Sequence, residues 1–304
     1  MSEPVVKLPE WFRRDSINAK AVMDMRRLMN GLHLNTICES ACCPNRYECF
    51  AQKTATFLIL GDTCTRSCRF CCVKKGRPAS PDPAEPANIV RAVARLGLQY
   101  AVITSVNRDD LPDGGASHYK AVIDAVHFHD PAILIEILIP DFSGCDAALE
   151  LVATSGISVL NHNVETVPRL YAKIRPEADY RRSISLLRRA HEIRPGLLTK
   201  SGLMLGLGET REEILEVMEH LKSAECSMLT LGQYLRPSSS HYEMSRFVGP
   251  EEFVYYRNEG EKMGFTHVVS GPNVRSSYHA SSAFRGASDA HSNIASAAIS
   301  VKSN

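Results

Sequence analysis

The sequence has no excess of charge of either sign, no long apolar run and only one tryptophan. Its 304 residues include 35 Lys and Arg against 34 Asp and Glu, a formal net charge of +1. This balance argues against wholesale binding to nucleic acid or to an anionic membrane. No stretch is long enough to span a bilayer, and the N-terminal segment MSEPVVKLPEWFRRD lacks the apolar core of a secretory signal. We therefore expect a cytoplasmic protein with neither a nucleic-acid nor a membrane partner.

Cysteine is the residue type that is distributed most unevenly. Of the ten cysteines, all but two lie between Cys38 and Cys72, and only Cys145 and Cys226 stand apart. Thiols stay reduced in the cytoplasm, so a metal or redox role is expected before a disulfide. We interpret Cys145 and Cys226 as ordinary small apolar residues.

Strand and helix patterns alternate along most of the chain. Residues 16–34, which include Ile17, have the apolar spacing of an amphipathic helix. Short apolar runs then predict strands at 56–60, 100–104, 133–139, 157–161, 197–205 and 228–233. Helical patterns lie between them, for example at 87–96, 116–128, 180–193, 211–223 and 250–263. This α/β alternation predicts a parallel sheet, either a partial (β/α)6 TIM-type barrel or a doubly wound open sheet.

A polar or glycine-containing cluster follows almost every predicted strand. Such clusters occupy 61–64, 105–110, 140–141, 161–165, 206–209 and 234–237. Active sites of α/β barrels form from the loops at the carboxyl ends of their strands. Several polar loops on one rim fit a single large site better than a crevice at one switch point of an open sheet. The sequence therefore favours the partial barrel.

Cys64, Cys68 and Cys71 follow the first predicted strand with the spacing C-x3-C-x2-C. Three thiolates from one short loop can hold three irons of a 4Fe–4S cluster and leave the last iron open. An open iron suits a chelating cofactor, and the amino and carboxylate groups of S-adenosylmethionine (SAM) can fill it. A zinc site completed by Cys72 is the alternative, but adjacent cysteines do not easily wrap one tetrahedral ion.

Another group of three thiols, the first cysteine group along the chain, precedes this loop. Cys38, Cys43 and Cys49 have the spacing C-x4-C-x5-C. On spacing alone, a zinc knuckle or a cluster of buried thiols remains an alternative. The nearness of the loop with Cys64, Cys68 and Cys71 indicates a second cluster beside the one expected there.

Seven ordered segments of this chain resemble the lipoyl synthase family of radical SAM enzymes, over about residues 38–280. The segments are CPN within the first cysteine group, TCTRSCRFC, TSVNRDDLPDGGA, LNHNVETVPRLYAKIRP, KSGLMLGLGET, LTLGQYLRPS and RSSYHA. The resemblance implies a partial barrel at 53–265, with an N-terminal extension at 1–52 and a C-terminal extension at 266–304. The N-terminal extension would carry an auxiliary 4Fe–4S cluster, and the barrel the SAM-binding cluster.

The resemblance also assigns the ligands of both clusters. Cys38, Cys43 and Cys49 would bind the auxiliary cluster, and Cys64, Cys68 and Cys71 the SAM cluster. The family's serine ligand to the auxiliary cluster falls in the RSSY string, at Ser277 or, as the alternative, at Ser276. Cys42 and Cys72 are additional thiols beside ligand positions, and nothing in the sequence gives them a role.

SAM presents a carboxylate, an ammonium group, a ribose and an adenine to its site. Asn163 and Glu165 are candidates for the ribose or the amino group, and Arg175 for the carboxylate. For each of them a turn or surface-pair role is the alternative. Asp109, Asp110 and Asp113 allow a hard-metal site, although capping and loop roles explain them as well.

The resemblance implies conversion of an octanoyl chain, linked to a lysine of a lipoyl carrier domain, into the lipoyl cofactor. Carbons 6 and 8 of this chain are unactivated, so acid, base or nucleophilic side chains cannot functionalise them, and a SAM-derived radical is needed. The auxiliary cluster would supply the two sulfur atoms. Implied partners are octanoylated lipoyl domains of 2-oxoacid dehydrogenase complexes, the glycine cleavage H protein and an electron donor. A methylthiotransferase and a zinc-binding scaffold remain the alternatives.

Overall fold

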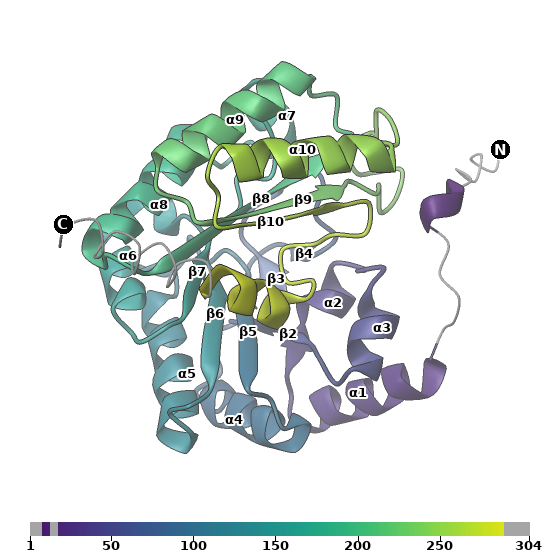
Figure 1. The fold of residues 1–304 in the computed structure, drawn as a ribbon. Coiled ribbons are helices and arrows are strands. Elements are labelled where there is room, and N and C mark those ends of the chain that lie inside the picture. The colour runs from purple at the N-terminus through teal and green to yellow at the C-terminus, as the bar shows by residue number, and fades with distance from the viewer. Residues whose placement is uncertain (1–7, 13–17, 289–304) are drawn as a thin grey trace, which may run out of the picture.

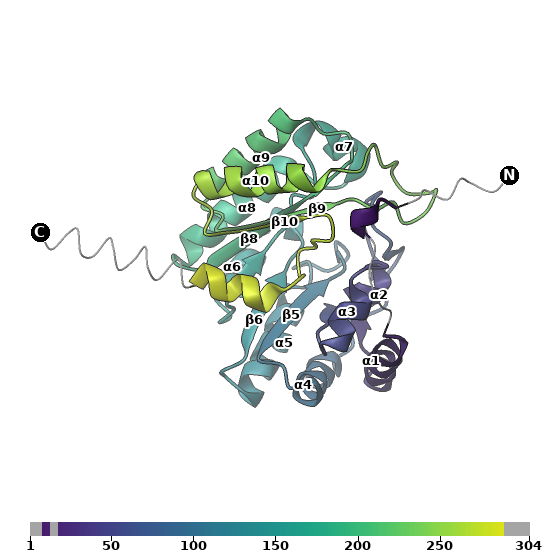
Figure 2. The same ribbon diagram turned by 45° about the vertical axis from the view of Figure 1, so that its right-hand side comes forward.

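The computed structural model describes residues 8–12 and 18–288. A curved eight-stranded sheet forms its centre, with helices along the outer face (Figures 1 and 2). The strand order is β1-β2-β5-β6-β7-β8-β9-β10, so each long strand lies beside the next one in the sequence. This is the α/β architecture of a partial barrel, with β1 at one edge of the sheet and β10 at the other.

The sheet contains every strand that the sequence predicts. Its strands are β1 (Asn35–Thr36), β2 (Thr56–Ile59), β5 (Tyr100–Ser105), β6 (Leu134–Leu138), β7 (Val159–Asn161), β8 (Leu198–Leu205), β9 (Met228–Gln233) and β10 (His267–Gly271). β1 is antiparallel to β2, and the other neighbours are parallel. β10 is a parallel strand that the sequence patterns did not predict, and it places Val268 opposite Leu229 of β9.

A helix of at least eight residues lies in each of the connections between successive parallel strands. These helices are α4 (Glu85–Leu96), α5 (Ala116–His129), α6 (Asp146–Ala153), α8 (Tyr180–Ile193), α9 (Arg211–Ser223) and α10 (Pro250–Lys262). The short α7 (Tyr171–Ile174) precedes α8. α6 and α7 are absent from the helices that the sequence predicts. The remaining helices, α4, α5, α8, α9 and α10, are confirmed, and α9 begins with a capping box formed by Thr210 and Glu213.

The first cysteine group lies on a small helical layer beside β2. This layer consists of α1 (Ala19–Gly31), α2 (Ile37–Ser40) and α3 (Arg46–Ala51), and the 3-10 turn Glu10–Phe12 precedes it in the chain. α1 corresponds to the predicted helix at 16–34, and the Asn18 side chain caps it by accepting from the Ala21 N–H at 3.0 Å. Ile17, which the prediction included, falls outside the described residues. No helix in the described part of the chain has the length and apolarity needed to cross a membrane.

Apolar packing between the sheet and its helices forms the main core. Ile103, Ile137 and Leu160 lie on neighbouring strands in register and are fully buried. Each such side chain contributes about 1.5–3 kcal/mol through its removal from water. This two-sided burial explains why the strands appear in the sequence as nearly continuous apolar runs.

A buried ion pair and a C-terminal helical segment cover the amino ends of the strands. Lys200 of β8 forms a fully buried ion pair with Glu136 of β6 at 2.8 Å. Residues 280–288 are helical, and they pack across the first residues of three strands. The residues in this contact are Ala283, Ala287, Val159, Leu198 and Met228. These contacts fill the interior of the sheet at this end, and the strands open onto a cavity at their carboxyl ends.

Candidate functional site

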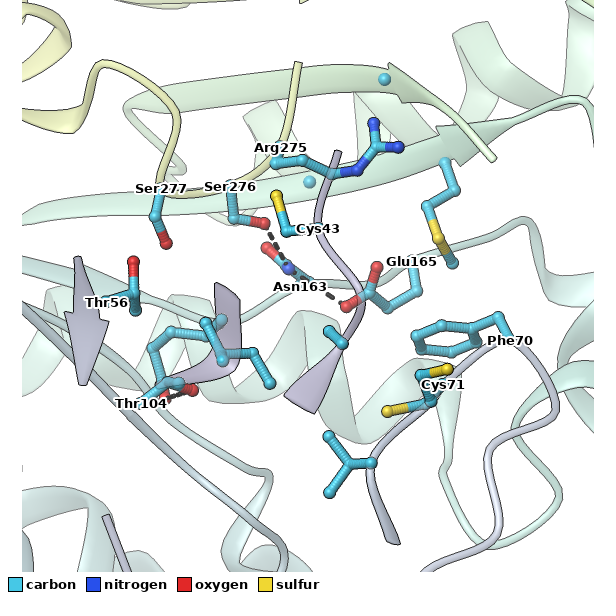
Figure 3. Close-up of a pocket in the computed structure, with 18 of the residues that line it drawn as sticks. Cys43, Thr56, Phe70, Cys71, Thr104, Asn163, Glu165, Arg275, Ser276 and Ser277 are labelled. Atoms are coloured by element: carbon cyan, nitrogen blue, oxygen red, sulfur yellow. Dashed lines mark hydrogen bonds between the residues drawn. The ribbon is translucent and has the colours of Figure 1, made fainter. Parts of the chain in front are cut away.

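A cavity of about 560 Å³ lies at the carboxyl ends of the strands (Figure 3). Residues of five of the six predicted polar loops line it, whereas the loop at 206–209 does not. Every residue that the sequence analysis selected for the two clusters and for SAM lines this one cavity. These residues are Cys38, Cys43, Cys49, Cys64, Cys68, Cys71, Asn163, Glu165, Arg175, Ser276 and Ser277. Parts of the chain that are far apart in the sequence therefore share one site.

The loop that contains Cys64, Cys68 and Cys71 is closed at its base. The short strands β3 (Thr63–Cys64) and β4 (Lys74–Lys75) pair with each other, and the Gly76 N–H donates to the Cys64 carbonyl at 3.0 Å. Two further backbone N–H groups, those of Arg66 and Asn107, point at the Cys64 sulfur from 3.4 Å. Hydrogen bonds of this kind stabilise negative charge on cluster thiolates. The donor set and its surroundings therefore fit a 4Fe–4S cluster.

Arg66 anchors this loop to the barrel. Its guanidinium is buried and donates to Asp109 at 2.7 and 2.8 Å and to Asp141 at 2.6 Å. Although burial acts to raise the pKa of Asp141, the hydrogen bonds and charge of Arg66 lower it to about 2. Sequence reasoning did not select Arg66. The one feature of the sequence that could have identified Arg66 is its position between two cysteines in the TCTRSC string.

The remaining aspartates of the TSVNRDDLPDGGA segment also have structural partners. Arg108 donates to both carboxylate oxygens of Asp110 at 2.8 Å. The Asp113 carboxylate accepts from the N–H groups of Gly115 and Ser117, at the start of α5. These aspartates therefore have the loop and capping roles that the sequence analysis gave as the alternative to a hard-metal site. In the described residues, no three His, Cys, Asp or Glu side chains are arranged so that they could hold a single metal ion.

The first cysteine group occupies two short helices and the turn between them. Cys38 lies in α2 and Cys49 in α3, and the Cys43 N–H donates to the Cys38 carbonyl at 3.0 Å. Burial raises the pKa of the Cys38 thiol to about 11, although hydrogen bonds from Thr56 act to lower it. Burial likewise raises the pKa of Cys71 to about 12. Buried thiols of this kind become thiolates when a bound metal offsets the cost of burial.

The C-terminal segment is tied to this first group. The Asn45 side chain donates to the Asn273 carbonyl at 2.7 Å, and the Tyr278 hydroxyl donates to Glu48 at 3.0 Å. Gly232 of β9 permits the approach, because a Cβ at this position would lie 2.1 Å from the Val274 carbonyl oxygen. These contacts bring residues 274–278 over the cavity.

The two adjacent serines have different surroundings. Asn163 Nδ2 donates to Ser276 Oγ at 2.6 Å and to Glu165 Oε1 at 3.1 Å. Figure 3 shows the Ser277 hydroxyl pointing toward that of Thr56, the first residue of β2. No hydrogen bond within the described residues engages Ser277 Oγ, so this oxygen is the more available of the two. Thr56 was not selected from the sequence, where it is one of many strand threonines.

Glu165 reaches the cavity through an unusual backbone conformation. Its φ is 66°, in the left-handed region that non-glycine residues rarely adopt. Its N–H donates to the Gly202 carbonyl and its own carbonyl accepts from the Met204 N–H, both at 2.9 Å. These bonds fix the turn after β7 against β8. Burial raises the pKa of the Glu165 carboxyl.

Two groups beside Glu165 complete this part of the cavity. Asn163 Oδ1 is buried and has no hydrogen-bond partner among the described residues. A buried acceptor of this kind fits a polar ligand. Arg175 Nη1 donates to the carbonyls of Asn163 and Val164 at 3.0 and 3.1 Å. Burial raises the pKa of Cys68, and the charge of Arg175 opposes this effect, so the guanidinium also lies beside the second cysteine loop.

Comparison with known proteins gives consistent results. The profile of the Radical SAM superfamily matches residues 58–221. A lipoyl synthase of Caldanaerobacter subterraneus is 52% identical over 275 residues, which are 90% of this chain and 96% of the relative. A lipoyl synthase of Geobacter sulfurreducens is 55% identical over 272 residues, covering 90% of this chain and 89% of the relative.

Solved structures show the same fold at low identity. Streptococcus suis SuiB bound to S-adenosylmethionine has a TM-score of 0.56 and 14% identity, over 83% of this chain and 60% of that chain. Methylornithine synthase has a TM-score of 0.51 and 14% identity, over 71% of each chain. At this level the likeness concerns the fold alone. The curated relatives, by contrast, are similar over nearly their whole length, and the chain belongs to the lipoyl synthase family of radical SAM enzymes.

Proposed function

We propose that this chain inserts two sulfur atoms, at C6 and C8, into an octanoyl group attached to a lysine of a lipoyl carrier domain. One observation carries the proposal. A single cavity brings together two groups of three cysteines, a polar pocket at Asn163 and Glu165, and the Ser276–Ser277 segment. Membership of the family implies SAM and 4Fe–4S clusters as cofactors, and two clusters are typical of lipoyl synthases.

We assign the SAM-binding cluster to Cys64, Cys68 and Cys71. The β3–β4 pair closes this loop, and backbone N–H groups point at the Cys64 sulfur. With these three thiols as ligands and Cys72 unassigned, one iron is left for SAM. When bound, the reduced cluster and SAM supply the radical, and the auxiliary cluster supplies the sulfur.

We assign the auxiliary cluster to Cys38, Cys43, Cys49 and Ser277. The ties from Asn45 to Asn273 and from Tyr278 to Glu48 hold the serine segment against the helices that carry these cysteines. Ser276 already accepts from Asn163, which supports Ser277 as the ligand.

We assign the polar groups of SAM to Asn163, Glu165 and Arg175. The unpartnered Oδ1 of Asn163 suits a ribose hydroxyl or the ammonium group, and the Glu165 carboxylate suits the ammonium. Arg175 lies beside Cys68 and holds the turn after β7 through two backbone carbonyls. Its positive charge suits the SAM carboxylate.

The substrates of a lipoyl synthase are lipoyl carrier proteins. Here we propose the lipoyl domains of 2-oxoacid dehydrogenase complexes and the glycine cleavage H protein, with a separate electron donor and a cytoplasmic location. We also propose a division into an N-terminal extension at 1–52, a radical SAM barrel at 53–265 and a C-terminal extension at 266–304, in which the extensions supply the edge strands β1 and β10 of the sheet. The helical layer of α1–α3 and the serine segment 274–278 fall into the two extensions.

The test is an anaerobic reaction of the cluster-loaded protein with SAM, a reductant and an octanoylated lipoyl-domain peptide. Mass spectrometry should show two sulfur atoms on the octanoyl chain. Cys68→Ala should abolish SAM cleavage while keeping about half of the iron. Cys43→Ala should retain part of the SAM cleavage but insert no sulfur, and Cys145→Ala serves as the control.

Three outcomes would contradict the proposal. Cleavage of SAM with an unchanged octanoyl chain would reject the substrate. Release of 5′-deoxyadenosine by Cys68→Ala at the wild-type rate would reject the SAM-cluster assignment. Full lipoyl formation by Cys43→Ala would reject the sulfur-donor assignment.

A further inference from the structure

Two cysteines that neither cluster assignment uses lie in contact at the wall of the cavity. The sulfur atoms of Cys42 and Cys72 are 3.5 Å apart, although 30 residues separate them in the chain. Cys42 belongs to the loop of the first cysteine group and Cys72 to the loop of the second. Both residues line the cavity. The two loops that carry the proposed cluster ligands therefore meet at this pair of thiols.

The backbone holds each of these thiols in place. Cys42 has a φ of 51°, and its N–H donates to the Glu39 carbonyl at 3.0 Å, directly after α2. Cys72 follows Cys71, whose N–H donates to the Cys68 carbonyl at 3.2 Å, and the β3–β4 pair closes the loop a few residues later. The meeting of the two sulfurs thus comes from two ordered turns, each fixed by its own hydrogen bonds.

Solvent reaches this pair through Cys42. Cys42 is exposed, whereas Cys72 is half-buried, as are most of the thiols assigned to the clusters. A small dissolved thiol or disulfide can therefore reach the Cys42–Cys72 pair from solvent. Thiol–disulfide exchange requires this kind of access.

We propose that Cys42 and Cys72 form a redox-active dithiol, separate from the six thiols assigned to the clusters. A low-molecular-weight disulfide oxidises the pair in two exchange steps. Cys42 attacks the disulfide and releases one small thiol, and Cys72 then attacks the resulting mixed disulfide and releases the second. The protein pair is oxidised to a disulfide and the small disulfide is reduced to two thiols, with no net gain or loss of protons.

Only a small movement of the two sulfur atoms is needed to form the Cys42–Cys72 disulfide. A disulfide has a sulfur–sulfur distance of about 2 Å, so the two sulfur atoms must approach by about 1.5 Å from their present separation. The product is a covalent bridge between the loop of the SAM cluster and the loop of the auxiliary cluster. Because neither thiol is an assigned ligand, the bridge forms with both clusters in place. This inference goes beyond the proposed function and does not depend on the substrate.

The experiment uses the cluster-loaded protein under anaerobic conditions, equilibrated with mixtures of reduced and oxidised glutathione. Free thiols are then blocked, and the digest is analysed by tandem mass spectrometry that separates Cys42 from Cys43 and Cys72 from Cys71. We expect a cross-linked pair joining Cys42 to Cys72, formed at unchanged iron content and removed by dithiothreitol. The wild-type protein alone gives this result, so it does not depend on how a variant folds.

Single-cysteine variants test which thiols form the cross-link. Cys42→Ser and Cys72→Ser should each abolish the cross-link and leave the remaining thiol as a mixed disulfide with glutathione. Cys145→Ser removes an exposed thiol elsewhere and should leave the cross-link at the wild-type level. Separate mixed disulfides at Cys42 and Cys72 in the wild-type protein, without a cross-link, would overturn the proposal. Appearance of the cross-link only after loss of iron would overturn it as well, as would loss of a cluster in Cys42→Ser or Cys72→Ser.

Discussion

Asn163 Nδ2 donates a hydrogen bond to Ser276 Oγ at 2.6 Å across a sequence separation of 113 residues. Asn163 lies in the turn after β7, and Ser276 lies in the segment that follows β10. The same amide also donates to Glu165 (Figure 3). This one side chain therefore connects the polar pocket proposed for SAM with the segment that carries the proposed serine ligand.

The first prediction concerns Ser277. An oxygen ligand is harder than a thiolate, so its bond to iron should exchange more readily than that of a cysteine. Ser277→Cys should hold the auxiliary cluster more firmly yet insert less sulfur, while SAM cleavage continues. Ser277→Ala should lose up to about half of the bound iron. Iron content and lipoyl product, measured side by side, test both variants.

Ser276→Ala is the matched control for these variants. It removes the hydrogen bond from Asn163, which costs about 1 kcal/mol of folding stability, but it should keep the iron content. If Ser276→Ala lost the cluster and both Ser277 variants matched the wild type, the ligand would be Ser276. Full activity of all three variants would mean that this segment contributes no ligand.

A second prediction concerns the close approach at Gly232. In Gly232→Ala the new methyl group would clash with the Val274 carbonyl, so residues 274–278 must move away from the cavity. We expect a loss of about 1–3 kcal/mol in stability, as for other overpacked sites, together with loss of auxiliary-cluster iron. Gly31→Ala is the control, because a Cβ there meets no atom within 4 Å. Urea unfolding and iron analysis measure both effects, and an unchanged iron content in Gly232→Ala would reject this role.

A third prediction concerns the charge of Glu165. Glu165→Gln keeps the size of the side chain and removes the carboxylate. If the carboxylate pairs with the SAM ammonium, loss of this charged hydrogen bond, worth about 1.5–3 kcal/mol, should raise the dissociation constant of SAM by about 10- to 100-fold. Equilibrium binding of SAM to the cluster-loaded protein measures this change. Glu216→Gln, on the exposed face of α9, should bind as the wild type does, and equal affinities of the two variants would contradict the assignment.

A fourth prediction is a pH dependence of stability that comes from His162. Its ring is buried, with Nδ1 2.9 Å from the Ile139 carbonyl and Nε2 3.0 Å from Ser183 Oγ. Burial lowers the pKa of His162 from 6.5 to about 4. Between these values the unfolded chain binds a proton that the folded chain does not bind. The free energy of unfolding is therefore at its full value above pH 6.5. It falls by up to about 3 kcal/mol as the pH decreases toward 4.

Urea unfolding between pH 5 and 7.5 tests this expectation. His162→Gln should flatten the pH dependence relative to the wild type. His129→Gln replaces an exposed histidine and should keep the wild-type slope. The same slope in all three proteins would show that His162 does not control acid stability.

Prediction of the fold from the sequence succeeded for the strands because each is a short apolar run bounded by polar or glycine residues. β10 was missed because it is only partly buried, and its sequence His-Val-Val-Ser-Gly gives a weak signal. α6 was missed because it is only eight residues long and follows β6 with little separation. Arg66 was missed because a buried arginine is recognisable only from its aspartate partners, which lie 43 and 75 residues further along the chain.

The sequence by itself determined the order of strands and helices, the two cysteine groups and the family. These properties depend on local periodicity and on ligand spacing within single loops. Only the tertiary structure decided which distant segments share the cavity, how Ser276 and Ser277 differ, and that Cys42 touches Cys72. Those relationships arise where the loops at the strand ends converge. Their geometry is set by packing and hydrogen bonds between elements that are far apart in the chain, and no local pattern encodes it.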